Sequence, residues 1–180
     1  MPPSATLPPR PLAALCAVAD ALAGARWLLS GSAGRALLGC PVRPRDIDLE
    51  VDPHDAVAVA AALGVELRPA QGGGRRSRRG RLARAGVEVD VTCGLAIDAP
   101  GGRLAPDFAL MWERAHPVVI AGRAIRAAPP EESVCRALVL GDWAGVARIA
   151  GQVAGAPEAI RLDAGYVSSR LSSARARAAR

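Results

Sequence analysis

The sequence contains no lysine, because all 23 of its basic residues are arginines. This absence excludes enzymes that form a Schiff base through lysine and nucleotide-binding proteins that use the lysine of the Walker A motif. Aromatic residues are also few, at 3% of the chain. The richness in alanine, arginine, glycine and proline is typical of a GC-rich genome and indicates nothing about function.

Cysteine and histidine are too few and too dispersed to predict a zinc site. The four cysteines form no Cys-x-x-Cys pair, and the two histidines complete no zinc-binding spacing. We therefore expect buried, reduced thiols.

Long hydrophobic runs are also missing, and none approaches the roughly 18 residues of a membrane-spanning helix. The first residues, from Met1 to Ser4, lack the basic and apolar segments of a signal peptide. We therefore expect a cytoplasmic protein that does not bind a membrane.

The net charge of +6 is concentrated in two segments, and the rest of the chain is acidic. The first segment contains Arg75, Arg76, Arg78, Arg79, Arg81 and Arg84, and the second contains Arg170, Arg175, Arg177 and Arg180. Arginine clusters of this kind bind phosphate groups, or they form a solvated loop and a solvated tail. Both interpretations stay open at this point.

The hydrophobic pattern of the 180 residues predicts one compact domain that mixes helices and strands. The expected helices span residues 11–23, 34–38, 53–63, 129–140, 143–150 and 157–166. The expected strands span residues 27–29, 46–51, 65–68, 78–85 and 87–92, followed by a hairpin of residues 118–120 and 124–126. A loop that begins at residues 72–74 is expected to carry the first arginine cluster.

This order of elements is typical of an α/β or α+β fold, in which helices flank a mixed central sheet. We expect a flexible N-terminus over residues 1–10 and a core over residues 11–128. Residues 129–180 are expected to form a helical region that packs on this core and ends in a basic tail.

Two acidic residues, Asp46 and Asp48, alternate with apolar residues on the strand expected over residues 46–51. Because alternate residues of a strand share a face, both carboxylates, followed by Glu50, point away from the core. Like charges on one face repel, and a bound cation would remove that repulsion. The alternative is an edge strand with one solvated face.

A second acidic strand, over residues 87–91, carries Glu88 and Asp90 on one face. Three carboxylates on neighbouring strands suit a two-metal site for phosphoryl or nucleotidyl transfer. Oxygen ligands of this type suit Mg²⁺. Either acidic residue of this strand fits the pattern as the third carboxylate.

A Gly-Ser turn, Gly31-Ser32, lies between an expected strand and an expected helix. Glycine lets the backbone approach a phosphate closely, and the start of a helix offers free amide donors. Arg35 follows within reach of a phosphate oxygen. Such a turn is common and indicates little on its own.

Taken together, Gly31-Ser32, Asp46-x-Asp48 and Asp90 resemble the pattern of the nucleotidyltransferase superfamily of DNA polymerase β. In that family the third aspartate lies within an apolar strand, which favours Asp90 over Glu88. The resemblance covers roughly residues 25–95. The spacer over residues 33–45 is longer than in minimal members and closer to that of CCA-adding and antibiotic-modifying enzymes. The lack of lysine is a second departure, so that arginine would have to bind the triphosphate.

The resemblance implies a small, stand-alone enzyme that transfers a nucleoside monophosphate from a triphosphate such as ATP to an acceptor hydroxyl. Asp46 and Asp48 would hold two Mg²⁺ ions, or Mn²⁺. Asp90 would ligate the catalytic metal and help to deprotonate the acceptor, which is an RNA end, a small molecule or a protein. The residues implied in binding the triphosphate are Gly31, Ser32, Arg35, Arg45 and, less directly, Arg43.

Two other functions compete with this interpretation. The first is a non-catalytic or antitoxin-like member of the same fold that binds a partner protein or a nucleic acid. The second is a nucleic-acid-binding module that uses the arginine clusters, although no aromatic residue suited to base stacking lies in them.

Overall fold

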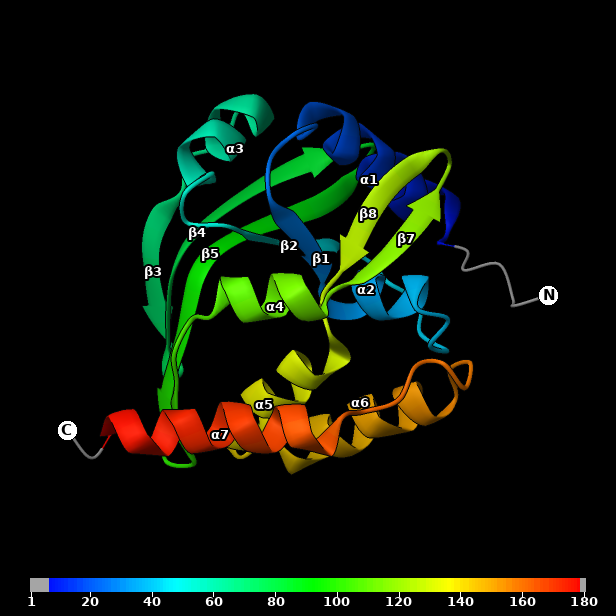
Figure 1. Ribbon diagram of the computed structural model, residues 1–180. Helices are drawn as coiled ribbons and strands as arrows, with labels where there is room; N and C mark the ends of the chain where they lie inside the picture. Colours follow the sequence, from blue (N-terminus) through cyan, green and yellow to red (C-terminus); the bar gives the residue numbers. More distant parts are fainter. Residues whose placement is uncertain (1–6, 179–180) are drawn as a thin grey trace.

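The computed structural model describes residues 7–178, with side chains for residues 7–172 (Figure 1). Its centre is a mixed sheet in the order β3-β4-β5-β2-β1-β8-β7, with β6 paired to β5. The strands are β1 (Trp27–Ser30), β2 (Ile47–Val51), β3 (Arg68–Gly72), β4 (Arg75–Arg84), β5 (Val87–Ala99), β6 (Gly102–Leu104), β7 (His116–Ile120) and β8 (Arg123–Ala127). The α/β fold with a mixed central sheet is therefore confirmed.

Helices cover the sheet on both sides (Figure 1). They are α1 (Pro9–Ala21), α2 (Gly31–Leu37), α3 (Ala56–Leu63), α4 (Phe108–Arg114), α5 (Pro130–Leu140), α6 (Trp143–Ala154) and α7 (Ala164–Ala178). Residues of α1, α2 and α3 pack into one apolar core with β1, β2 and β5. Helix α4 packs against Leu28, whose side chain lies on the other face of the sheet.

The alternation of residues in β2 and β5 decides which side chains enter this core. Ile47, Leu49 and Val51 of β2 are buried in it, as expected from the sequence. The intervening Asp48 and Glu50 therefore point to the opposite face. The same alternation in β5 places Asp90 on that opposite face. The strands that carry Leu28, Asp48 and Asp90, which are β1, β2 and β5, lie in one sheet.

The arginine cluster at residues 75–84 lies entirely in strand β4. The strand expected over residues 78–85 is therefore confirmed, and the loop expected before it is wrong for residues 75–77. Gly73 and Gly74, both with positive φ, make the turn before the cluster begins. The backbone of β4 then pairs with β3 on one side and with β5 on the other. Only one residue of β4, Gly80, is buried, and the apolar alternation typical of a half-buried strand is missing at its start.

Several expected boundaries also differ. Asp46 lies in a bend before β2, and β3 begins at Arg68 instead of spanning residues 65–68. Helix α3 begins at Ala56, because Asp52 accepts a hydrogen bond from the backbone N–H of His54 and holds a turn there. The helix expected over residues 157–166 is wrong, since α7 begins at Ala164. Helix α4 and strand β6 were not expected.

The ends of the chain are described only in part. Residues 1–6 of the expected flexible N-terminus lie outside the described residues, and so do the side chains of the expected basic tail beyond residue 172. Within the described part of the chain, no helix combines the length and the apolar character needed to cross a membrane.

Candidate active site

Polar residues line up across three neighbouring strands on the face opposite to α1, α2 and α3. Asp48 of β2 pairs with Ser30 of the antiparallel strand β1 and with Asp90 of the parallel strand β5. Paired residues of adjacent strands lie about 5 Å apart and point to the same face. The carboxylates of Asp48 and Asp90 are therefore neighbours.

Gly31, the first residue of α2, lies directly against Asp48. Its φ of +61° favours glycine, and a Cβ atom at this position would overlap Oδ2 of Asp48. The absence of a side chain at residue 31 therefore makes room for the carboxylate. This is the physical reason for a glycine in the Gly-Ser turn.

A pocket of about 500 Å³ opens beside these residues. One wall is acidic and is formed by Asp48 and Glu50, with Ser30 and Gly31 next to them. Arg75 and Arg79, from the β3–β4 hairpin, line the same pocket. The remaining lining residues are Leu49, Ala70, Gln71, Gly72, Ser77, Thr92, Leu95, Ser133 and Arg136. A pocket lined by both carboxylates and guanidinium groups suits a ligand that contains both a cation and phosphates.

The carboxylate of Asp48 has an unusual electrostatic environment. Burial, together with the negative charges of Asp46, Asp90 and Glu50, raises the pKa of Asp48 to about 6, against the opposing effect of Arg79. Among the described residues, no side chain donates a hydrogen bond to this carboxylate. Asp48 is therefore a half-buried acid that makes no ion pair with the side chains that the structure describes.

This raised pKa predicts a pH dependence of metal binding. Because the pKa of Asp48 in the folded protein is above its ordinary value, the group stabilises the metal-free fold at low pH. That contribution is lost as the pH rises through about 6. A metal must displace the proton, so the affinity for Mn²⁺ should fall about tenfold per unit below pH 6. Mn²⁺ titrations between pH 5 and pH 8 test this, and an affinity that is constant from pH 5 to pH 7 contradicts it.

Asp90, only 4% exposed, is held by two arginines of β4. Arg79 donates to both carboxylate oxygens, with Nε 2.5 Å from Oδ1 and Nη2 bonded to Oδ2. Nε of Arg81 lies 3.2 Å from Oδ2. The charge of Asp90 is therefore already balanced within the chain, unlike that of Asp48.

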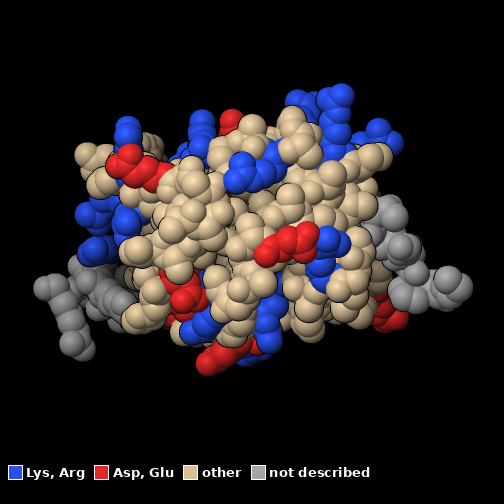
Figure 2. Space-filling view, turned by 90° about the horizontal axis from the view of Figure 1, so that it is seen from above, with Lys and Arg blue, Asp and Glu red and all other residues tan. Residues whose placement is uncertain are grey.

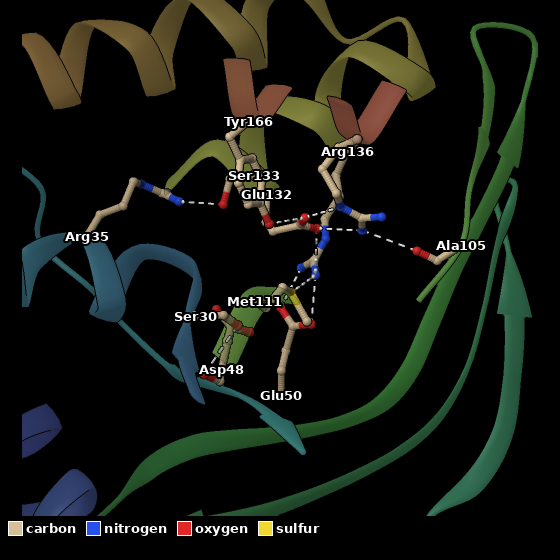
Figure 3. A network of polar contacts seen from close by, with 11 residues as sticks. Ser30, Arg35, Asp48, Glu50, Ala105, Met111, Glu132, Ser133, Arg136 and Tyr166 are labelled. Atoms are coloured by element: carbon tan, nitrogen blue, oxygen red, sulfur yellow. Dashed lines mark hydrogen bonds and ion pairs between the residues drawn. The ribbon is translucent and has the colours of Figure 1, made fainter. Parts of the chain in front are cut away.

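Glu50 is balanced by Arg136 of α5 in a bidentate ion pair, with both N–O distances at 2.6–2.7 Å (Figure 3). Arg136 also contacts the Sδ atom of Met111 and lies 3.8 Å from a carboxylate oxygen of Glu132. Glu132 in turn accepts hydrogen bonds from Tyr166 and Arg170 of α7. This network fastens α5 and α7 to β2 beside Asp48.

Breaking the Glu50–Arg136 pair should destabilise the fold strongly. Replacing Arg136 by Met leaves the carboxylate of Glu50 buried and unpaired, which typically costs about 3–5 kcal/mol of unfolding free energy. Arg123→Met is the matched control, because Arg123 makes an equally bidentate but exposed pair with Asp20. Urea denaturation of both variants measures the loss of unfolding free energy, which should be much larger for Arg136→Met than for Arg123→Met. Equal losses would contradict a role for burial.

The residues present fit a divalent metal in a specific way. Among the described residues, no three His, Cys, Asp or Glu side chains are grouped to hold a metal ion. Mg²⁺ in phosphate-transferring enzymes is, however, commonly held by one or two carboxylates together with substrate phosphates. Asp48 and Asp90 supply such a pair, and Gly31 leaves room for one of them. Glu50 lines the pocket as well, and both of its oxygens accept hydrogen bonds from Arg136, as those of Asp90 accept from Arg79.

Of the site residues expected from the sequence, Gly31 and Asp48 line the pocket, Asp90 lies buried beside it, and the others lie around it. Arg35 is buried on α2, where Nε lies 2.9 Å from Oε1 of Gln152 and Nη1 lies 3.2 Å from Oγ of Ser133. Arg43 and Arg45 are exposed in the segment before β2, and Asp46 is half-buried there. Ser32 is half-buried in α2, whereas Ser30, one residue before Gly31, lines the pocket.

Ser30 and Arg136 were not expected from the sequence, and Arg79 was expected only as one member of the arginine cluster at residues 75–84. The position of Arg79 near Asp90 could have been predicted, because a two-residue turn at Ala85-Gly86 fixes the register that pairs Arg81 with Asp90. Arg79 then follows two residues away on the same face. No local signal pointed to Arg136, which is 86 residues from Glu50.

Comparison with known proteins places this geometry in a known fold. Neither a protein-family profile nor a curated protein matches the sequence. A protein from Thermotoga maritima that is assigned as a nucleotidyltransferase has a similar structure, with a TM-score of 0.64 and 21% identity over 80% of this chain and 89% of that one. ANT(2″)-Ia in complex with adenylyl-2″-tobramycin is 17% identical over 91% and 94% of the chains, with a TM-score of 0.47, too low to support a conclusion. The likeness to the Thermotoga maritima protein shows that this chain has a nucleotidyltransferase fold.

Proposed function

We propose that the protein is a Mg²⁺-dependent nucleotidyltransferase of the DNA polymerase β type. The observation that carries the proposal is the pairing of Asp48 with the buried Asp90 on adjacent parallel strands, beside a pocket that Asp48 lines together with Arg75 and Arg79. The reaction is the transfer of a nucleoside monophosphate from a triphosphate, ATP among the candidates, to an acceptor hydroxyl.

Asp48 and Asp90 would hold Mg²⁺, or Mn²⁺, and the expected third ligand, Asp46, would add its negative charge from the bend before β2. Bound there, a divalent ion supplies charge neutralisation at the transferred phosphate and lowers the pKa of an acceptor hydroxyl. Asp90 would accept the acceptor's proton. Two ions match the sequence pattern of the family that this chain resembles.

The remaining walls of the pocket suit the triphosphate and its leaving group. The backbone at Gly31 and Ser32 would contact the β- and γ-phosphates, and Ser30 offers a hydroxyl in the pocket. Arg75 and Arg79 line the same pocket as Asp48 and would bind phosphate oxygens. Arg45 is exposed before β2 and would act from the rim of the pocket. Arg35 is buried on α2 and bonded to Gln152 and Ser133, so it would have to leave them to reach a phosphate.

The acceptor would be a hydroxyl on an RNA end, a small molecule or a protein. Basic side chains gather on the side of the molecule where β3 and β4 lie, at the left of Figure 2. An anionic acceptor would approach the pocket most favourably from this side.

The proposal is tested by transfer of label. The full chain is incubated with each of the four α-³²P-labelled ribonucleoside triphosphates and Mg²⁺, in the presence of cell extract. We expect label to appear in a macromolecule or a small molecule with one triphosphate, and to require Mg²⁺. Absence of transfer with all four, under conditions where the protein is folded, would favour the non-catalytic alternative.

A further inference from the structure

The Arg79–Asp90 ion pair occupies the position at which the proposed function requires a metal. Both oxygens of Asp90 accept from Arg79, and Oδ2 also accepts from Arg81. A divalent ion binds the same oxygen lone pairs, so metal and guanidinium compete for Asp90. Coordination of a metal by both oxygens of Asp90 therefore requires Arg79 to move.

The guanidinium of Arg79 lies close to both site carboxylates. Its charge opposes the rise in the pKa of Asp48, and the charges of Asp90 and Asp48 raise the pKa of Arg79. Arg79 therefore compensates part of the negative charge that a bound cation would otherwise compensate.

The surroundings of Arg79 permit it to move, in contrast to those of Arg136. The side chain of Arg79 is 42% exposed and lines the pocket, and its hydrogen bonds go to Asp90 alone among the described residues. The side chain of Arg136 is 21% exposed and is held by Glu50, Met111 and Glu132 together. Arg136 is therefore held by three side chains, whereas Arg79 is held by Asp90 alone among the described residues.

We propose that Arg79 is an internal counter-cation, which holds Asp90 in the metal-free protein and transfers to an anionic group of the substrate when a divalent metal binds. The proposal rests on the proposed function. It makes Arg79 a positioning residue. It also makes the binding of metal and of phosphate mutually favourable: a metal on Asp90 frees Arg79 for a phosphate, and a phosphate on Arg79 frees Asp90 for a metal.

The test is the affinity for Mn²⁺ in the absence of nucleotide, measured by electron paramagnetic resonance of the free ion. Arg79→Gln should bind Mn²⁺ about tenfold more tightly than the parent, because a charged, partly exposed hydrogen-bonded pair no longer competes. Arg75→Gln is the matched control, because it removes the same charge from the same pocket without touching Asp90. It should change the affinity by less than about twofold.

The direction of the effect separates this proposal from a structural role, since damage to the fold would weaken metal binding. Weaker or unchanged binding in Arg79→Gln, or equal tightening in Arg75→Gln, overturns it. If label transfer occurs but Arg79→Gln does not tighten Mn²⁺ binding, this inference alone fails. If neither the parent nor Arg79→Gln binds Mn²⁺, the proposed function fails with it.

A second measurement follows the parent protein itself and uses the conservative variant Arg79→Lys only to assign the signal. The Nε–H proton of Arg79, shielded by its bond to Asp90, should give a slowly exchanging NMR signal that is missing in Arg79→Lys. Saturation with Mg²⁺ and inorganic triphosphate should shift this signal and speed its exchange with water. A signal unchanged at saturation contradicts the proposed movement.

Discussion

Asp48→Asn is expected to abolish nucleotidyl transfer, by on the order of a thousandfold or more, while leaving the fold intact. Asparagine keeps the shape of aspartate but loses the negative charge that would bind a divalent cation. Because Asp46, Glu50 and Asp90 all disfavour the ionised form of Asp48, the substitution also relieves repulsion. The metal-free variant should therefore be as stable as the parent, or slightly more stable.

Label transfer and urea denaturation measure the two halves of this prediction. Asp98→Asn is the matched control, because Asp98 is an exposed carboxylate on the same strand as Asp90 and does not line the main pocket. It should leave transfer unchanged. Substantial transfer by Asp48→Asn would show that another group carries the reaction, and a large loss of stability would show that Asp48 is mainly structural.

Gly31→Ala should have the second-largest effect, because it acts on both the backbone and Asp48. An alanine held at a φ of +61° costs about 1–2 kcal/mol, and its Cβ would overlap the carboxylate of Asp48. A displacement of about 1 Å at a reacting centre can lower the rate about a hundredfold. We expect a loss of that order in transfer, together with weaker Mn²⁺ binding.

Gly64→Ala separates the two causes. Gly64 has a nearly equal φ of +65°, and a Cβ there meets no atom within 4 Å. Both variants should lose similar stability from the backbone, and only Gly31→Ala should lose activity and metal affinity. If Gly64→Ala lost as much activity, general destabilisation and not contact with Asp48 would be the cause.

The sequence predicted the acidic face of the sheet well, because alternation within a strand is a local property. Apolar residues at positions 47, 49 and 51 have to face a core, which places Asp48 and Glu50 on the other side. The same reasoning applied to Asp90, and its pairing with Asp48 followed once the two strands were neighbours.

The parts that the sequence did not predict depend on contacts between distant residues or on exposed elements. The strand expected over residues 78–85 was confirmed, but the extension of β4 back to Arg75 was not predicted, because only Gly80 of that strand is buried and no apolar alternation marks its start. Arg136 reaches Glu50 only through the packing of α5 on the sheet. The hydrogen bonds of Arg35 likewise could not be predicted, because its partners Ser133 and Gln152 lie on helices about a hundred residues later in the chain.

The central claim, that this pocket binds a metal–triphosphate complex through Asp48, is tested most directly by thermal unfolding with Mg²⁺ and each of the four ribonucleoside triphosphates. A ligand at a hundred times its Kd stabilises a fold by about 2.7 kcal/mol, which for a chain of this size raises the Tm by roughly 5–10 °C. We expect such a rise for the parent with at least one triphosphate, dependent on Mg²⁺ and absent in Asp48→Asn. A parent whose Tm does not change with any of the four, or a rise that survives in Asp48→Asn, would contradict the claim.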